Sequence, residues 1–138
     1  MMTSNPQALR HCICAGLAVG LFLILQGCGG STAMQDIDSK QNLKILGMAI
    51  INYEGDEGQW PDSLDQVKEQ AEKAAADMGS DKDFATLMTN PLTGDNPGYQ
   101  YVMPAEGDPI EETVMLYQLR GGERDETLAK CYQSGSVR

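Results

Sequence analysis

Hydrophobic residues in the first half of the chain recur at steps of three and four, as on one side of an α-helix. Two isoleucines widen this stripe, which consists of Leu43, Leu46, Ala49, Ile50, Tyr53, Ile45 and Ile51. So broad an apolar face suits a helix that lies across a sheet. The pattern predicts a helix from about Asp36 to Tyr53, ended by the glycines that follow and by the turn at Trp60-Pro61.

A second amphipathic pattern follows, with apolar residues at Leu64, Val67, Ala71, Ala74, Ala75 and Met78. Ser63 and Gln66 have the spacing of a capping box, so this helix should begin at residue 62 or 63 and end near Gly79. A short third helix is expected over residues 80–88, with Ser80 and Asp83 as its capping residues.

Beyond residue 90 the pattern changes to strands and turns. Asn96-Pro97-Gly98 has the Pro-Gly order that a type II turn prefers. Strands are predicted at residues 99–103, 113–119 and 127–132, the last with a short continuation through Val137. Helices followed by strands indicate the α+β class, here a long N-terminal helix packed on a small antiparallel sheet with one or two short extra helices.

The first 27 residues differ in character from this domain. A polar segment with Arg10 precedes an uninterrupted apolar run, Cys12–Leu25. Its fourteen residues are too few for a spanning helix, which needs about twenty, but suit the core of a signal peptide, which needs about 7 to 15. The run predicts an export signal, and cleavage after it would remove His11, the only histidine of the chain.

The residues after the apolar run, Leu25-Gln26-Gly27-Cys28, resemble the lipobox of bacterial lipoproteins. In that family the chain is cut before the cysteine, whose thiol carries a diacylglyceryl group and whose amino group is usually acylated. The resemblance implies a lipoprotein signal peptide over residues 1–27, a lipidated Cys28 with a flexible tether over residues 28–35, and a globular domain over residues 36–138. The alternative is ordinary secretory cleavage with a coincidental cysteine.

Such an anchor would place the protein in the cell envelope, held to a bacterial membrane and facing the periplasm or the cell exterior. Two or three acyl chains suffice for this, because each buried CH₂ contributes about 0.8 kcal/mol.

The formal net charge of -10 over 138 residues argues against nucleic acid as a partner. Without its signal peptide the chain keeps Cys28 and Cys131, and Cys131 is expected as a core residue rather than a reactive thiol.

A set of short motifs follows one order along the domain: Asn42-Leu43-Lys44, Gly47-Met48-Ala49-Ile50, Asn52-Tyr53, Gly58-Gln59-Trp60-Pro61, Asn90-Pro91, Gly98-Tyr99-Gln100-Tyr101-Val102 and Ser134-Gly135-Ser136-Val137-Arg138. This order resembles bacterial pseudopilins of the type II secretion G class and a large pilin-like family of unknown function. The resemblance implies a pseudopilin-like domain, with secretion or pilus-like assembly proteins as partners. Pseudopilins begin with a helix that builds a fibre core, so the lipobox in its place predicts no polymerisation of that kind.

Acidic residues gather in three segments, of which residues 106–112 are the best candidate for calcium because some major pseudopilins bind calcium in that loop. The candidate ligands are Glu106, Asp108, Glu111 and Glu112. Calcium takes six to eight oxygen ligands, and none of the three segments has EF-hand spacing. The alternative, which we favour, is a set of solvated loops on an acidic protein without a cofactor.

The aromatic and methionine residues allow a similar choice between core and site. Aromatic residues at a helix-sheet junction usually belong to the core, although an exposed platform could bind a partner. We expect core positions for Trp60, Tyr99, Tyr101, Tyr117, Met48, Met88, Met103 and Met115.

The sequence therefore favours a lipid-anchored envelope protein with a non-enzymatic structural or interaction role near a type II secretion or pilus-like assembly. The alternative is a periplasmic or cell-surface lipoprotein that binds a ligand or calcium. A hydrolase is a third class, since paired carboxylates can serve as acid and base, and it would require a concave acidic pocket.

Overall fold

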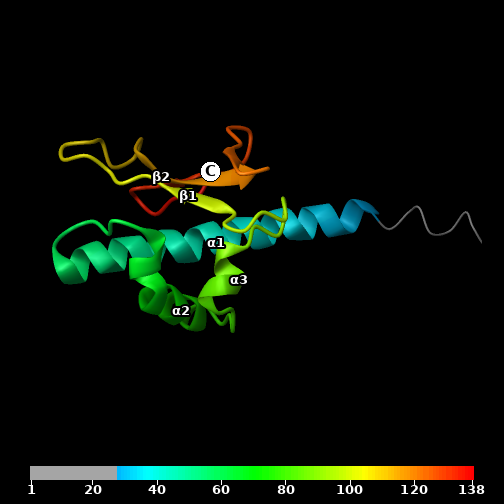
Figure 1. Cartoon of the computed structure of the whole chain (residues 1–138), viewed down its shortest axis with the longest axis horizontal. Helices are drawn as coiled ribbons and strands as arrows, with labels where there is room; N and C mark the ends of the chain where they lie inside the picture. Colours follow the sequence, from blue (N-terminus) through cyan, green and yellow to red (C-terminus); the bar gives the residue numbers. More distant parts are fainter. Residues whose placement is uncertain (1–27) are drawn as a thin grey trace, which may run out of the picture.

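The computed structural model describes residues 28–138, so the predicted signal peptide lies outside the described residues. The chain forms the helices α1 (Cys28–Glu57), η1 (Leu64–Val67), α2 (Lys68–Asp77) and α3 (Phe84–Met88), and then the strands β1 (Tyr99–Tyr101), β2 (Val114–Arg120), β3 (Glu123–Arg124) and β4 (Cys131–Tyr132). In Figure 1 α1 runs between two layers, the antiparallel sheet on one side and α2 with α3 on the other. The predicted α+β class, with a helix packed on a small antiparallel sheet, is confirmed.

Helix α1 is longer at both ends than the sequence pattern indicates. It begins at Cys28, eight residues before Asp36, and the segment predicted as a flexible tether forms its first two turns. Once a helix exists, each added residue gains one hydrogen bond, and the two glycines at 29 and 30 cost only about 1 kcal/mol each. At the other end α1 continues to Glu57 and stops at Gly58, whose φ of 71° is the left-handed conformation of a helix C-cap.

The middle of α1 is buried all along its predicted apolar stripe. Leu43, Ile45, Leu46, Ala49 and Ile50 have no exposed surface and form one cluster with residues of α2 and the sheet. The breadth of the stripe follows from the position of the helix, because a helix between two layers must present apolar side chains to both. No helix within residues 28–138 is both long and apolar enough to span a membrane.

The second predicted helix is present as η1 followed by α2, and its apolar face is buried at Leu64, Val67, Ala71, Ala74 and Ala75. The predicted capping box is wrong. The Gln66 N–H donates to the Ser63 main-chain carbonyl in the 3₁₀ turn (3.3 Å), which leaves it unavailable to the Ser63 hydroxyl. The Gln66 side chain instead accepts from the Asp62 N–H (2.7 Å).

The third helix, α3, is shorter than predicted and starts where Asp83 caps it. The Asp83 carboxylate accepts from the Thr86 N–H (2.8 Å), which confirms Asp83 as the capping residue. Ser80 lies before the helix, where its hydroxyl accepts from the Lys82 N–H (3.4 Å).

Strand β2 is the centre of the sheet and pairs antiparallel with the three other strands. Strands β1 and β4 are shorter than predicted, and β3 was not predicted. The pairing of Arg120 with Glu123 encloses Gly121 and Gly122, both of which have positive φ (63° and 80°). Two adjacent positive φ values are the geometry of a type I′ turn, which favours a hairpin.

The turn before β1 differs from the predicted type II turn. Gly98 does not have the positive φ that such a turn requires, and the Asn96–Pro97 peptide bond is cis. Glycine is needed at 98 for space, because a Cβ there would lie 2.5 Å from the Asn90 main-chain nitrogen and 2.8 Å from the Asp95 carbonyl oxygen.

Candidate functional site

An open groove of about 400 Å³ lies between the start of η1 and strand β1. Its lining residues are Asp62, Ser63, Leu64, Met88, Pro97, Tyr99, Gln100, Tyr101, Leu119 and Gly122. The segment that follows α1 supplies Asp62, Ser63 and Leu64 to this lining, opposite the three residues of β1. The groove is the candidate functional site.

Strand β1 is an edge strand whose hydrogen-bonding groups alternate between β2 and the groove side. Gln100 lies opposite Tyr117, and the flanking bonds join Val102 N–H to the Met115 carbonyl (2.8 Å) and Leu119 N–H to the Gly98 carbonyl (2.9 Å). In antiparallel pairing the residues between such bonded positions direct their N–H and C=O groups away from the partner strand. Tyr99 and Tyr101 are these residues, so their main-chain groups lie on the free edge of β1.

The two tyrosine hydroxyls of β1 have different surroundings. The Tyr99 side chain is buried, and its hydroxyl donates to the Ser39 carbonyl of α1 (3.3 Å). The Tyr101 hydroxyl is also shielded from solvent, yet it has no hydrogen-bond partner among the described residues. Since a buried polar atom normally has a partner, the Tyr101 hydroxyl is an unsatisfied group at the groove.

Asp62 is the one charged residue among the residues that line the groove. Desolvation by burial raises the pKa of Tyr101 to about 12, and the negative charge of Asp62 acts in the same direction. The Asp62 carboxylate is exposed, and it accepts a long hydrogen bond from the Gln66 side-chain amide of η1 (3.4 Å). The groove therefore combines a negative charge with an unsatisfied hydroxyl.

The buried polar side chains of the described domain form hydrogen bonds between its elements. The Asn90 side-chain amide donates to the Gln118 side-chain oxygen (2.9 Å), and the Gln118 amide donates to the Ala129 carbonyl (3.1 Å). The Asn42 amide lies at 3.2 Å from the Thr89 carbonyl, and its oxygen accepts from Lys82 Nζ (2.8 Å). The bonds of Gln118 to Asn90 and of Asn42 to Thr89 tie β2 and α1 to the loop between α3 and β1. The other two bonds reach the segments before β4 and before α3.

The predicted calcium candidates are not brought together. Glu106, Glu111 and Glu112 are exposed, and one Asp108 carboxylate oxygen accepts from the Ala105 N–H within its own turn (2.9 Å). Within residues 28–138 no three acidic, cysteine or histidine residues lie close enough to hold a metal ion together. Calcium binding by this loop stays an untested prediction.

Most of the aromatic and methionine residues predicted as core are placed as expected. Tyr99 and Met115 are buried, and Trp60, Tyr101, Met48 and Met88 are half-buried against the core.

The prediction is wrong for Met103, which is 46% exposed, and for Tyr117. The Tyr117 ring carries the Arg124 guanidinium at 4.4 Å from its centroid, and Arg124 Nε also donates to the Gln100 side-chain oxygen (2.6 Å). A strand tyrosine at the surface under a cation and a strand tyrosine in the core occupy the same kind of position in the hydrophobic pattern. The pattern alone therefore does not distinguish the two.

The two cysteines of the described chain have different positions. Cys131 is buried, and burial raises the pKa of its thiol to about 12, as suits the predicted core residue and not a reactive thiol. Cys28, the predicted lipidation site, is the first residue of α1, and the lipobox residues before it lie outside the described residues.

A comparison of this chain with protein families, with curated proteins and with solved structures finds no match.

The sequence interpretation missed the groove, although it had considered its aromatic residues. The local pattern indicates a helix start at Asp62, and at Tyr101 it favours a core position over an exposed binding platform. The signal that could have pointed to an edge was the shortness of the strand between Gly98 and Pro104, because a short first strand after a turn is typical of a sheet edge. The wall opposite that edge depends on the return of the chain after α1, which no local pattern encodes.

Proposed function

We propose that the protein is a lipid-anchored component of the bacterial cell envelope, with a non-enzymatic interaction role near a type II secretion or pilus-like assembly. The supporting observation is that Cys28 lies in the N-terminal part of α1, which extends away from the rest of the domain. The side chains from Ser31 to Gln35 are exposed, and Ser39 is the first buried residue among the α1 side chains that the structure describes. The N-terminal end of α1 projects beyond the sheet, α2 and α3 (Figure 1).

This helical segment sets the distance between an acylated Cys28 and the domain. Eleven residues, 28–38, precede Ser39, and at 1.5 Å per residue they span about 16 Å. A helix keeps that distance, whereas a flexible glycine-serine tether would let the domain collapse onto the membrane. A domain held at a fixed height suits a protein that meets other envelope proteins.

The anchor is tested by the intact mass and membrane association of the native protein. We expect a chain that begins at Cys28 and carries two or three acyl groups in the membrane fraction. Cys28→Ser should abolish acylation, whereas Cys14→Ser, a matched change in the preceding apolar run, should leave it intact. An unacylated wild-type chain in the soluble fraction would refute the anchor.

The role in an assembly is tested by deleting the gene and measuring export of a type II secretion substrate and surface pili. We expect one of the two to fall, with rescue by the wild-type chain and none by Cys28→Ser. Unchanged export together with unchanged pili would refute the role while leaving the anchor in place.

A further inference from the structure

The free edge of β1 has the features of a binding site for another polypeptide. We propose that an extended peptide segment adds to the sheet as a new strand beside β1, and that this segment carries a basic side chain that reaches Asp62. The proposal concerns the groove alone and does not depend on acylation of Cys28. Strand addition of this kind obtains affinity from main-chain hydrogen bonds and specificity from alternate side chains.

The main-chain pattern of β1 supplies the first part of the argument. Tyr99 and Tyr101 direct their N–H and C=O groups away from β2. These main-chain groups have no hydrogen-bond partner among the described residues. Proteins usually protect such an edge by a charge, a proline, a bulge or a cover. Pro97 lies just before β1 and Asp62 lies across from it, but Tyr99 and Tyr101 border an open groove of about 400 Å³, which leaves room for a strand.

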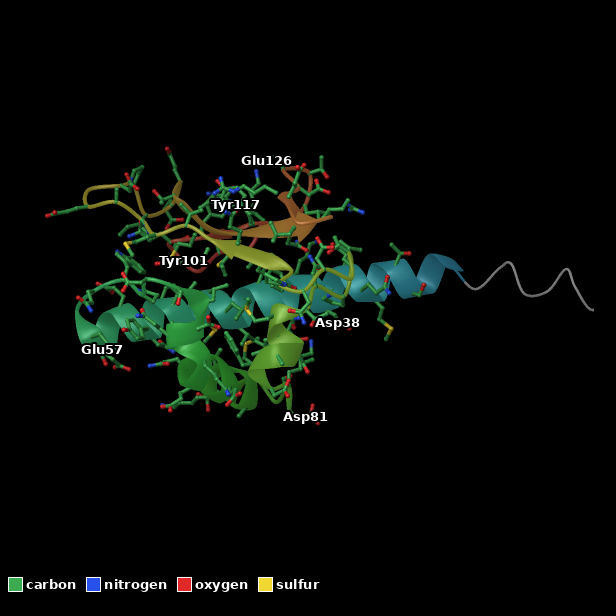
Figure 2. All side chains as sticks on the ribbon, in the orientation of Figure 1. Asp38, Glu57, Asp81, Tyr101, Tyr117 and Glu126 are labelled. Carbon is green, nitrogen blue, oxygen red and sulfur yellow. The ribbon has the colours of Figure 1, made fainter. Side chains whose placement is uncertain are left out.

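The Tyr101 hydroxyl supplies a second, independent observation. It is shielded from solvent and has no partner among the described residues, although it lies on a residue that lines the groove. Figure 2 shows Tyr101 between the sheet and α1, on the side of β1 that faces the helix. If the Tyr101 side chain turns toward the groove, a polar side chain of an added strand can pair with its hydroxyl, and the cost of leaving that hydroxyl unpaired is removed on binding.

The charge of the groove selects the kind of partner. Asp62 is the one charged residue among its lining residues, and the whole chain has a net charge of -10. The net negative charge of the chain therefore attracts a basic segment over a distance, and Asp62 attracts its basic side chain at contact. A second copy of this chain would bring another Asp62 and another -10 to the same edge, so charge disfavours self-pairing.

A labelled six-residue peptide, Thr-Val-Lys-Val-Thr-Val, tests the proposal by fluorescence anisotropy against the full chain in detergent micelles. In an added strand every second N–H bonds to β1 and the others point to solvent. We therefore expect N-methylation of one alternate set of residues to abolish binding and N-methylation of the other set to leave it unchanged. Equal effects of the two methylated peptides would overturn the strand-addition proposal, as would no binding of the parent peptide at about 1 mM.

The charge contribution is tested by exchanging the lysine for glutamate, which should weaken binding about tenfold, equivalent to about 1.4 kcal/mol. Asp62→Asn keeps a side-chain oxygen for Gln66. In this variant the lysine and glutamate peptides should differ in affinity by less than about twofold. Asp65→Asn, an exposed change on the next turn and outside the groove, should keep the full difference. If Asp62→Asn and Asp65→Asn behave alike, or if the full chain forms a dimer that the peptide dissociates, the proposed basic partner is wrong.

Discussion

Gly47 of α1 lies directly against Cys131 of β4, at a distance that leaves no room for a side chain at position 47. A Cβ built on Gly47 would lie well inside van der Waals contact with the Cys131 sulfur and 3.7 Å from its Cβ. Both residues are buried. Glycine at 47 therefore allows close approach of the helix to the sheet.

Replacing this glycine tests how closely the layers fit. Gly47→Ala should lower the free energy of unfolding by about 1–3 kcal/mol, because the added methyl group overfills a dense core. Gly55→Ala is the matched control, since position 55 is in the same helix and a Cβ there meets nothing within 4 Å. It should stabilise the protein by up to about 1 kcal/mol through helix propensity.

Urea unfolding of both variants measures these changes. The combination of Gly47→Ala with Cys131→Ala should be less destabilised than Gly47→Ala alone, because removing the sulfur frees the space that the new methyl group needs. A Gly47→Ala variant as stable as Gly55→Ala would contradict the close approach.

The two tyrosines of β1 form a second matched pair. Tyr99→Phe removes a hydroxyl that donates to the Ser39 carbonyl, so the free energy of unfolding should fall by about 1 kcal/mol. Tyr101→Phe removes a hydroxyl without a partner in the described chain, so stability should stay the same or rise by up to about 1 kcal/mol. Chemical denaturation of the two variants compares them, and equal losses would show that the Tyr101 hydroxyl has a partner.

Stability should fall in alkaline solution because the folded state keeps protons that the unfolded chain releases. Burial raises the pKa of Cys131 from 9.0 to about 12, burial and Asp62 raise that of Tyr101 from 10.0 to about 12, and burial raises that of Tyr99. For such groups the stabilisation is fully present below the unfolded pKa and is lost as the pH rises through the folded pKa. The loss should begin near pH 9 with the thiol and continue to about pH 12.

Urea titrations between about pH 8 and pH 11 measure this slope, which follows from proton release on unfolding. Cys131→Ser cannot titrate there, so its unfolding free energy should change less than that of the wild type between about pH 9 and pH 10. A wild-type curve that is flat over the whole range would show that these groups are accessible in the folded state.

The hydrogen bond between the buried Asn90 and Gln118 side chains predicts a large loss of stability when Asn90 is replaced. Asn90→Ala removes the bond to Gln118 and the bond that the Asn90 oxygen accepts from the Leu92 N–H (2.9 Å), and it leaves the Gln118 oxygen without its donor. The free energy of unfolding should fall by about 2–4 kcal/mol. Asn52→Ala, an exposed change in α1, should cost less than about 0.5 kcal/mol. Similar losses in thermal or urea unfolding would mean that the amide pair is not formed.

The apolar pattern was a reliable guide to the helices because it depends on local spacing. The predicted stripe of α1 is buried at Leu43, Leu46 and Ile50, and half-buried at Tyr53. The same pattern failed at the helix ends, where extension to Cys28 and Glu57 involves residues without an apolar period. It also failed at Ser63, because the choice between a hydroxyl and a carbonyl acceptor depends on whether the first turn is α or 3₁₀.

The candidate site was the least predictable part of the molecule. The local pattern assigns residue 62 to a helix start and Tyr101 to a strand. The groove that they share depends on the return of the chain from α1 to the sheet. The calcium candidates illustrate the reverse case, in which neighbours in sequence are not gathered in space. Spacing along an irregular loop does not fix where side chains point, whereas spacing along a helix does.

The regular period of apolar residues is enough to predict the stripe of α1 and the buried face of α2, and the order of helices and strands predicts the fold class. The core position of Cys131 follows from the chemistry of an isolated thiol. Which polar groups are paired, and which edge of the sheet is free, depends on the tertiary structure. The Asn90 amide meets Gln118 and the Tyr99 hydroxyl meets Ser39 across separations of 28 and 60 residues. Hydrogen bonds need partners at about 3 Å in the right direction, and only the folded chain brings such distant groups to that distance.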